Sequence, residues 1–190
     1  MRTIRLLPAA LPLIGLVCAC ATAKAGPGSA AGGGAAPPAS VGTRYYERTG
    51  GFSLCLPESW EAVDFPGLQY QVIISQGEDE TARPNITFYD EPFQDSLGAY
   101  VDAVLEEARK SAGGFTLVER GALTAGTVRG ERVIIESNRE GRAFRQFLYF
   151  FPGPGGQNRA LVATATVLAG SPPSFDALFD ETMKTFEWVP

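Results

Sequence analysis

Hydrophobic and polar residues alternate with a period of two through most of the chain beyond residue 43. Because successive side chains of a strand point to opposite faces, this period predicts strands. In the stretch FSLCLPESW it places Phe52, Leu54 and Leu56 on one face of a strand that Pro57 ends. The predicted strands lie at residues 44–49, 52–56, 68–75, 84–90, 115–124, 128–138, 142–151 and 159–168.

The last three predicted strands are joined by short turn sequences. NREGR at residues 138–142 and PGPGGQN at residues 152–158 are rich in residues that favour tight turns, above all glycine, proline and asparagine. We therefore expect these three strands to form an antiparallel meander.

Two other segments repeat their apolar residues every three or four positions, which predicts helices. Asp95 or Ser96 can cap the first helix, and Gly113 and Gly114 end it. Charged residues occupy the opposite face of this helix, so we expect its apolar face to pack on a sheet and its charged face to point to solvent. Its apolar face consists of Leu97, Tyr100, Val101, Val104, Leu105 and Ala108.

The second predicted helix runs from Pro172 or Ser174 to about Thr185. Its apolar stripe consists of Phe175, Leu178, Phe179, Met183 and Phe186, and a short extension, EWV, follows it. Strands, a helix, an antiparallel group and a second helix thus succeed one another. This order predicts an α+β domain over residues 43–190, in which helices flank a central antiparallel sheet as an α/β/α sandwich.

The first 19 residues have the pattern of an export signal. Two arginines precede an apolar run, residues 6–17, that is too short to span a bilayer comfortably. The run ends in Val-Cys-Ala-Cys, which resembles the lipobox of bacterial lipoproteins. Cys20 fits the acylated position because a small alanine precedes it, whereas Cys18 follows the bulky Val17. The resemblance implies cleavage before Cys20 and a lipid anchor on its sulfur; an ordinary signal peptide cut at an A-x-A site is the alternative.

Residues 20–42 consist almost entirely of alanine, glycine, proline and serine. Without an apolar period they predict a flexible tether with a reach of roughly 25–30 Å. The mature domain would then hang from a membrane and face the periplasm or the cell exterior. In a cell with two membranes the outer one is favoured, because Ala21 stands where many inner-membrane lipoproteins have aspartate.

Composition narrows the chemistry that the chain can perform. Histidine is absent, which excludes Ser-His-Asp and Cys-His catalysis and every histidine-bearing metal site. The net charge of −5 argues against a nucleic-acid partner, since phosphates require a basic surface. We assign no catalytic residue, metal ligand or cofactor, and only a lysine-based or carboxylate-pair mechanism stays open.

An arginine-rich predicted hairpin is the candidate interaction surface. Acidic residues lie among the arginines, so cross-strand ion pairs or a solvated sheet edge would account for them. If the arginines share one face, that face would suit an acidic partner or lipid headgroups. The five residues are Arg129, Arg132, Arg139, Arg142 and Arg145.

Cys55 is interpreted as a packed core thiol. It lies in an apolar strand, and once Cys20 is acylated and the signal removed it has no partner for an intrachain disulfide. Aromatic residues crowd the strand at 142–151, where alternation places Phe147 and Tyr149 on one face and Phe150 on the other. Core packing under two helices accounts for them, although a hydrophobic groove for a peptide or lipid stays open.

The stretch GGFSLCLPESWEAV resembles the entry motif of the PsbP/Mog-like superfamily. The resemblance continues through SLGAYVDAVLEEAR, GTVRGERVIIES, RQFLYFFPGPGG, ALVATATV and SFDALFDETMKTFEW, so it covers about residues 44–189. It implies a central antiparallel sheet between helices. Members include an extrinsic photosystem II subunit, a nuclear-import factor, secretion chaperones, and bacterial lipoproteins of the DcrB and LpqN kinds. They act as binding or accessory proteins and share no catalytic set.

The sequence therefore predicts a lipid-anchored binding or accessory module of the bacterial cell envelope. We expect a monomeric domain with an envelope protein as its partner. A carrier of a lipid or small apolar ligand is the alternative, and a carboxylate-dependent hydrolase is a third reading.

Overall fold

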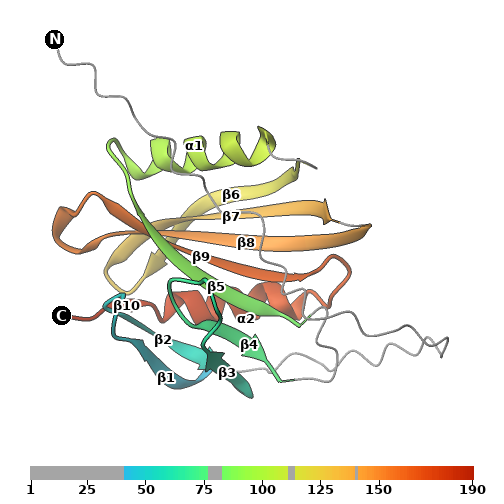
Figure 1. The fold of residues 1–190 in the computed structure, drawn as a ribbon, viewed down its shortest axis with the longest axis horizontal. Helices are drawn as coiled ribbons and strands as arrows, with labels where there is room; N and C mark the ends of the chain where they lie inside the picture. Colours follow the sequence, from blue (N-terminus) through green and yellow to red (C-terminus); the bar gives the residue numbers. More distant parts are fainter. Residues whose placement is uncertain (1–40, 77–82, 111–113, 140) are drawn as a thin grey trace, which may run out of the picture.

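The computed structural model describes residues 41–76, 83–110, 114–139 and 141–190. Its main feature is a seven-stranded antiparallel sheet (Figure 1). From one edge to the other its strands are β3 (Trp60–Val63), β4 (Val72–Ser75), β5 (Asn85–Pro92), β9 (Arg159–Leu168), β8 (Arg142–Pro152), β7 (Val128–Arg139) and β6 (Thr116–Ala125). The predicted α+β fold is therefore confirmed.

The strands β7, β8 and β9 form the antiparallel meander that the turn sequences predicted. A two-residue loop joins β6 to β7, because Ala125 lies opposite Val128, and Gly126 has a φ of 55°. Glycine at the first loop position is typical of hairpin turns that match the twist of their strands. The β8–β9 connection contains a short 3-10 turn, η1 (Pro154–Gly156).

Helix α1 (Leu97–Lys110) covers one face of the large sheet (Figure 1). The hydroxyl oxygen of Ser96 accepts a hydrogen bond from the Ala99 N–H at 3.2 Å, so Ser96 is the cap. The buried residues of α1 pack with Val133, Ile135 and other residues of β7, β8 and β9. Apolar burial against the sheet thus holds the helix that the period of its sequence predicted.

Helix α2 (Ser174–Lys184) lies on the other face, with all five residues of its predicted stripe at or below 8% exposure. The main hydrophobic core lies here, and Phe186 stacks on Phe151 of β8 with ring centroids 4.0 Å apart. Phe147 and Tyr149 face this core, whereas Phe150 faces α1, as alternation predicted.

A second, three-stranded antiparallel sheet shares the α2 side of the molecule. It consists of β1 (Val41–Glu47), β2 (Phe52–Pro57) and β10 (Glu187–Trp188), in the order β1-β2-β10. Phe52 and Leu54 of β2 enter the main core, and neither is exposed. The layer opposite α1 is therefore a helix together with a small sheet.

The structure differs from the expected elements at several boundaries. Strand β1 begins at Val41, two residues before the predicted start of the domain. Strand β4 is limited to residues 72–75, because the preceding residues form a turn in which the Leu68 N–H donates to the Phe65 carbonyl at 3.2 Å. Strand β3 was not predicted at all. No helix within the described ranges is both long enough and apolar enough to span a membrane.

Candidate functional site

The predicted lipidation site, Cys20, and the tether up to residue 40 lie outside the described residues. An acidic stretch of the sequence, Glu78-Asp79-Glu80, lies outside them as well. The acylation of Cys20 stays a prediction from the sequence.

The arginine-rich hairpin proves to be β7 and β8, and its arginines lie on two faces of the sheet. In β7, Ile134 faces the α2 side and Val133 the α1 side, so alternation directs Arg132 toward α2. The same alternation directs Arg129 and Arg139 to the α1 side. In the register of the hairpin, Arg142 lies opposite Arg139, and Arg145 lies opposite Glu136. The structure thus separates the five residues into two groups.

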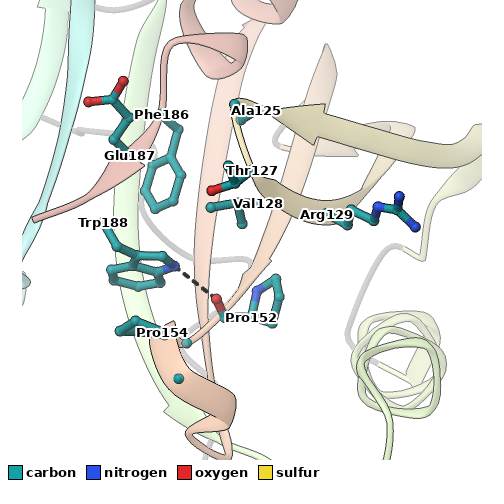
Figure 2. A pocket seen from close by; sticks show the side chains of 12 residues that line it. Ala125, Thr127, Val128, Arg129, Pro152, Pro154, Phe186, Glu187 and Trp188 are labelled. Atoms are coloured by element: carbon teal, nitrogen blue, oxygen red, sulfur yellow. Dashed lines mark hydrogen bonds between the residues drawn. The ribbon is translucent and has the colours of Figure 1, made fainter.

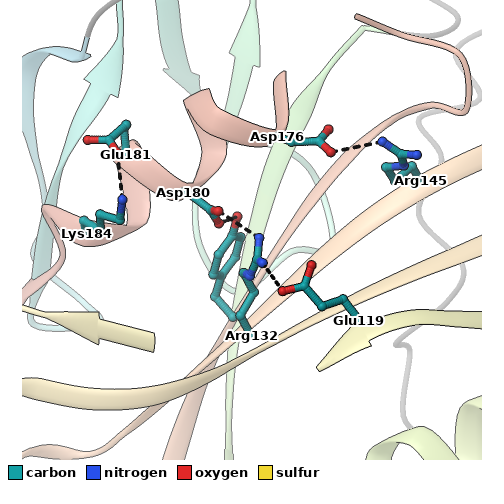
Figure 3. Close-up of polar contacts among 8 residues, drawn as sticks. Glu119, Arg132, Arg145, Asp176, Asp180, Glu181 and Lys184 are labelled. Carbon is teal, nitrogen blue, oxygen red and sulfur yellow. Dashed lines mark hydrogen bonds and ion pairs between the residues drawn. The ribbon is translucent and has the colours of Figure 1, made fainter. Parts of the chain in front are cut away.

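Arg132 lies between two carboxylates beneath α2 (Figure 3). It donates to Asp180 of α2 at 2.8 Å and to Glu119 of β6. The hydroxyl of Tyr149 also donates to Asp180, at 2.9 Å. Burial, reinforced by the Asp180 charge, raises the pKa of Tyr149 well above its usual value. This group joins β6, β7 and β8 to α2 through charge-assisted hydrogen bonds.

Arg145 makes the second such link. It donates to Glu136, its cross-strand neighbour, at 3.2 Å and to Asp176 in the first turn of α2 at 3.0 Å (Figure 3). The carboxylates of both groups are therefore held by arginines that fasten α2 to the sheet. Arg145 thus forms a cross-strand ion pair, as the sequence analysis considered for the arginines of this hairpin.

The arginines on the α1 side have different surroundings. Arg139 donates to the side-chain oxygen of the buried Gln146 at 3.2 Å, and burial lowers the pKa of Arg139. Arg129 is exposed at the end of β7 beside the β6–β7 turn, and forms no ion pair with the other described residues. Binding of a partner by these arginines stays a prediction.

A groove of about 720 Å³ lies at the same end of the sheet as Arg129 (Figure 2). Three segments distant in sequence line it: residues 125–129 of the β6–β7 hairpin, residues 152–155 after β8, and residues 186–188 with β10. We call it the β10 groove. Figure 2 shows Phe186 and Trp188 on one side and Val128 on the other. Phe186 is fully buried, so Trp188, Val128 and two prolines supply the accessible apolar part of a lining that also contains polar residues.

Hydrogen bonds fix the wall of the groove that Trp188 forms. The indole N–H donates to the Pro152 carbonyl at 2.9 Å. The guanidinium of Arg159 lies over the indole, 5.1 Å from the ring centroid, and donates to Asp90 at 3.3 Å. Tyr70 donates to the same carboxylate, and burial raises the pKa of the Tyr70 hydroxyl. These contacts hold the Trp188 indole in one orientation at the groove.

Cys55 is less buried than predicted. Its thiol is free and only half-buried, because β2 belongs to the small sheet and Cys55 lies on the face opposite Phe52 and Leu54. Its backbone N–H donates to the hydroxyl of Thr185 at 2.7 Å. Among the described residues, no three side chains of His, Cys, Asp or Glu gather closely enough to hold a metal ion.

Sequence reasoning did not find the β10 groove. Each segment that lines it has an ordinary local role as a hairpin turn, a glycine-rich connection or a C-terminal extension. The one available signal was the pair of aromatic residues, Phe186 and Trp188, on either side of a charged residue at the end of the chain.

The fold, in contrast to the sequence, has known counterparts. No family model and no curated protein match the sequence. LpqN of Mycobacterium tuberculosis, described as involved in cell envelope biogenesis, superposes with a TM-score of 0.61 and 15% identity, over 73% of this chain and 83% of LpqN. Cyanobacterial PsbP (CyanoP) of Synechocystis sp. PCC 6803 superposes with a TM-score of 0.59 and 12% identity, over 85% of this chain and 98% of CyanoP.

Both alignments extend over most of this chain and most of the matching protein. At such low identity the likeness establishes the architecture and not the activity. The chain therefore has the fold of PsbP-like and LpqN-like proteins, as its sequence motifs implied.

Proposed function

We propose that this chain is a lipid-anchored binding or accessory module of the bacterial cell envelope. The observation that carries the proposal is the β10 groove, a preformed apolar-walled surface on a domain whose charged clusters beneath α2 are already paired. The lipobox-like sequence at Cys20 and the tether that follows it support the location. The shared fold with LpqN, a protein described as involved in cell envelope biogenesis, supports the accessory role.

A carrier of a small apolar ligand is the second candidate, because Trp188, Val128 and the two prolines of the groove give it accessible apolar surface. Native mass spectrometry of the chain purified from membranes separates the two functions. A carrier retains a lipid or other apolar molecule, whereas a binding module does not need one.

The anchor is tested with Cys20→Ser. Two or three acyl chains hold a protein durably on a membrane, so the wild-type chain should sediment with membranes and resist salt extraction. The Cys20→Ser variant should appear in the soluble fraction, and globomycin should block processing of the wild type. A variant that stays with the membranes would contradict the anchor.

The partner is tested in living cells with a photo-crosslinking amino acid. We expect adducts with a specific envelope protein from Thr127 at the rim of the groove, and none from Glu107 on the exposed side of α1. Adducts from Glu107 alone would support a binding module that uses another surface. The absence of adducts from both positions, with an apolar molecule retained in native mass spectrometry, would favour the carrier.

A further inference from the structure

Strand β6 leaves a long edge of the large sheet open. It is the outermost strand, and its one strand partner is β7. Two residues join these strands, so Ala125 and Val128 form a hydrogen-bonded pair. Alternate residues of an antiparallel strand bond to opposite sides, so Arg120, Ala122 and Thr124 direct their backbone N–H and C=O away from β7. The described part of the chain provides no hydrogen bond to any of these backbone groups.

This edge has little that would keep another strand from pairing with it. Proline, outward lysine and bulges are the usual protection of a sheet edge. The one bulge of β6 lies at its start, at residues 117–119, and residues 120–125 contain neither proline nor lysine. The guanidinium of Arg120 turns back onto Asp102 of α1 and Glu131 of β7. The outward groups of β6 therefore form a template for a further strand.

The open edge is complementary to itself. Its three outward residues are evenly spaced about Ala122, so a second β6 can lie antiparallel to the first with a two-fold axis at Ala122. Ala122 then pairs with its own counterpart, and Arg120 pairs with Thr124 of the second copy. Every outward N–H and C=O obtains a partner, and no like charges lie directly opposite each other. A two-fold axis at Arg120 would instead place two guanidinium groups opposite each other.

Exposed apolar residues lie at the same edge. Leu117 and Val118 are 40% and 50% exposed, and they are two of the four large apolar residues that are exposed in the described ranges. In the register centred on Ala122, Val118 comes next to the β6–β7 turn of the second copy, which covers it. The opposite edge of the large sheet is β3, which has only four residues.

We propose that two copies of this chain pair through their β6 strands, antiparallel about a two-fold axis at Ala122, so that their large sheets form one continuous sheet. The sequence analysis expected a monomeric domain, because the open edge and its symmetry appear only in the fold. The inference goes beyond the proposed function. The proposed anchor adds to it by confining all copies to one membrane surface, which raises the effective concentration of one edge for another.

The first test uses disulfide formation in membranes that contain the full-length acylated chain with Cys55→Ser. Ala122→Cys adds a thiol that lies directly opposite its counterpart, with Cα atoms about 5.5 Å apart, a distance that a disulfide can bridge. Thr124→Cys adds the matched control thiol on the same strand, four residues out of register with its counterpart and roughly 14 Å from it. After mild oxidation, non-reducing gels should show a dimer for Ala122→Cys and none for Thr124→Cys.

The second test uses charge. A carboxylate at position 122 faces its own copy, whereas a carboxylate at position 124 faces Arg120 of the second copy. In sedimentation velocity of the acylated chain in detergent, we expect Ala122→Glu to weaken the dimer at least roughly tenfold and Thr124→Glu to preserve it. Both residues are exposed, so both variants should keep the urea midpoint of the wild type.

The inference is wrong if the wild-type chain sediments as a monomer, if the two cysteine variants form disulfides equally, or if the two glutamate variants weaken the dimer equally. A slowly exchanging Ala122 amide in a monomeric chain would show that another segment covers the edge, and deletion of residues 21–40 would identify the tether as that segment. Partner adducts from Thr127 on a monomeric chain would leave the proposed function standing and overturn this inference alone.

Discussion

A glycine permits the close approach of β7 to β8. A Cβ at Gly130 in β7 would lie 2.3 Å from the backbone oxygen of Phe150 in β8. Because this oxygen belongs to the backbone, no change of side-chain rotamer can relieve the contact. Gly121 lies in β6, the edge strand next to β7, and nothing lies within 4 Å of its Cβ position. The same substitution at the two glycines therefore compares a crowded position with an open one.

We expect Gly130→Ala to lower the free energy of unfolding by about 2–3 kcal/mol, because the methyl group would force the strands apart. Gly121→Ala should change it by less than about 1 kcal/mol, and in the stabilising direction, since alanine restricts the unfolded chain. Urea denaturation of both variants measures the difference. Equal changes in the free energy of unfolding would show that the backbone at Gly130 accommodates a methyl group without loss of stability.

At the scale of elements, α2 is fastened to the sheet by side chains of unequal exposure. Arg132, whose side chain is 18% exposed, pairs with Asp180 and Glu119, whereas Lys184 pairs with Glu181 at the solvent, with side chains 52% and 61% exposed. The cost of removing a cation depends on how well water can replace it.

Arg132→Met should therefore lower the free energy of unfolding by roughly 2–3 kcal/mol, because Asp180 and the Tyr149 hydroxyl would remain beneath α2 without the cation. Lys184→Met on the same helix should change it by less than about 0.5 kcal/mol. Thermal and urea unfolding of the two variants provide the comparison. A small effect of Arg132→Met would mean that apolar packing alone positions α2.

Long elements were predictable from the sequence, and short ones were not. The meander strands each contain ten or more residues, so their alternation is repeated often enough to be read, and Gly141 and Gly155 mark their turns. Strand β3 has four residues, of which only Trp60 is buried, so it offers almost no period.

The faces of the arginines in β7 could have been predicted from alternation alone, since Arg132 is even-numbered and Arg129 and Arg139 are odd-numbered. The β10 groove had no such local signal, because tertiary packing brings its three segments together.

At the scale of the whole molecule, buried and half-buried tyrosines determine how stability depends on alkaline pH. Burial is the main cause that raises the pKa of Tyr45, Tyr70, Tyr89, Tyr100 and Tyr149 above the ordinary value of about 10. A group with a raised folded-state pKa contributes stability below its unfolded pKa, and this contribution is lost as the pH rises above that value.

We therefore expect the urea midpoint to be constant up to about pH 9 and to fall steeply between about pH 10 and 11, as the unfolded tyrosines ionise and the folded ones do not. The Tyr149→Phe variant, which has one fewer buried titrating group, should show a shallower fall. Midpoints that stay level through pH 11 would contradict the burial of these hydroxyls.

The small sheet joins the two ends of the domain, since β2 at residues 52–57 pairs with β10 at residues 187–188. A chain emerging in order from a ribosome cannot complete this sheet until residues 187 and 188 are free. Phe52 and Leu54 must wait equally long for Phe186 to close the core beside them. Such long-range closure delays the completion of the core until residues 186–188 are available. However early β1 and β2 are made, they gain their third strand only at this late step of folding.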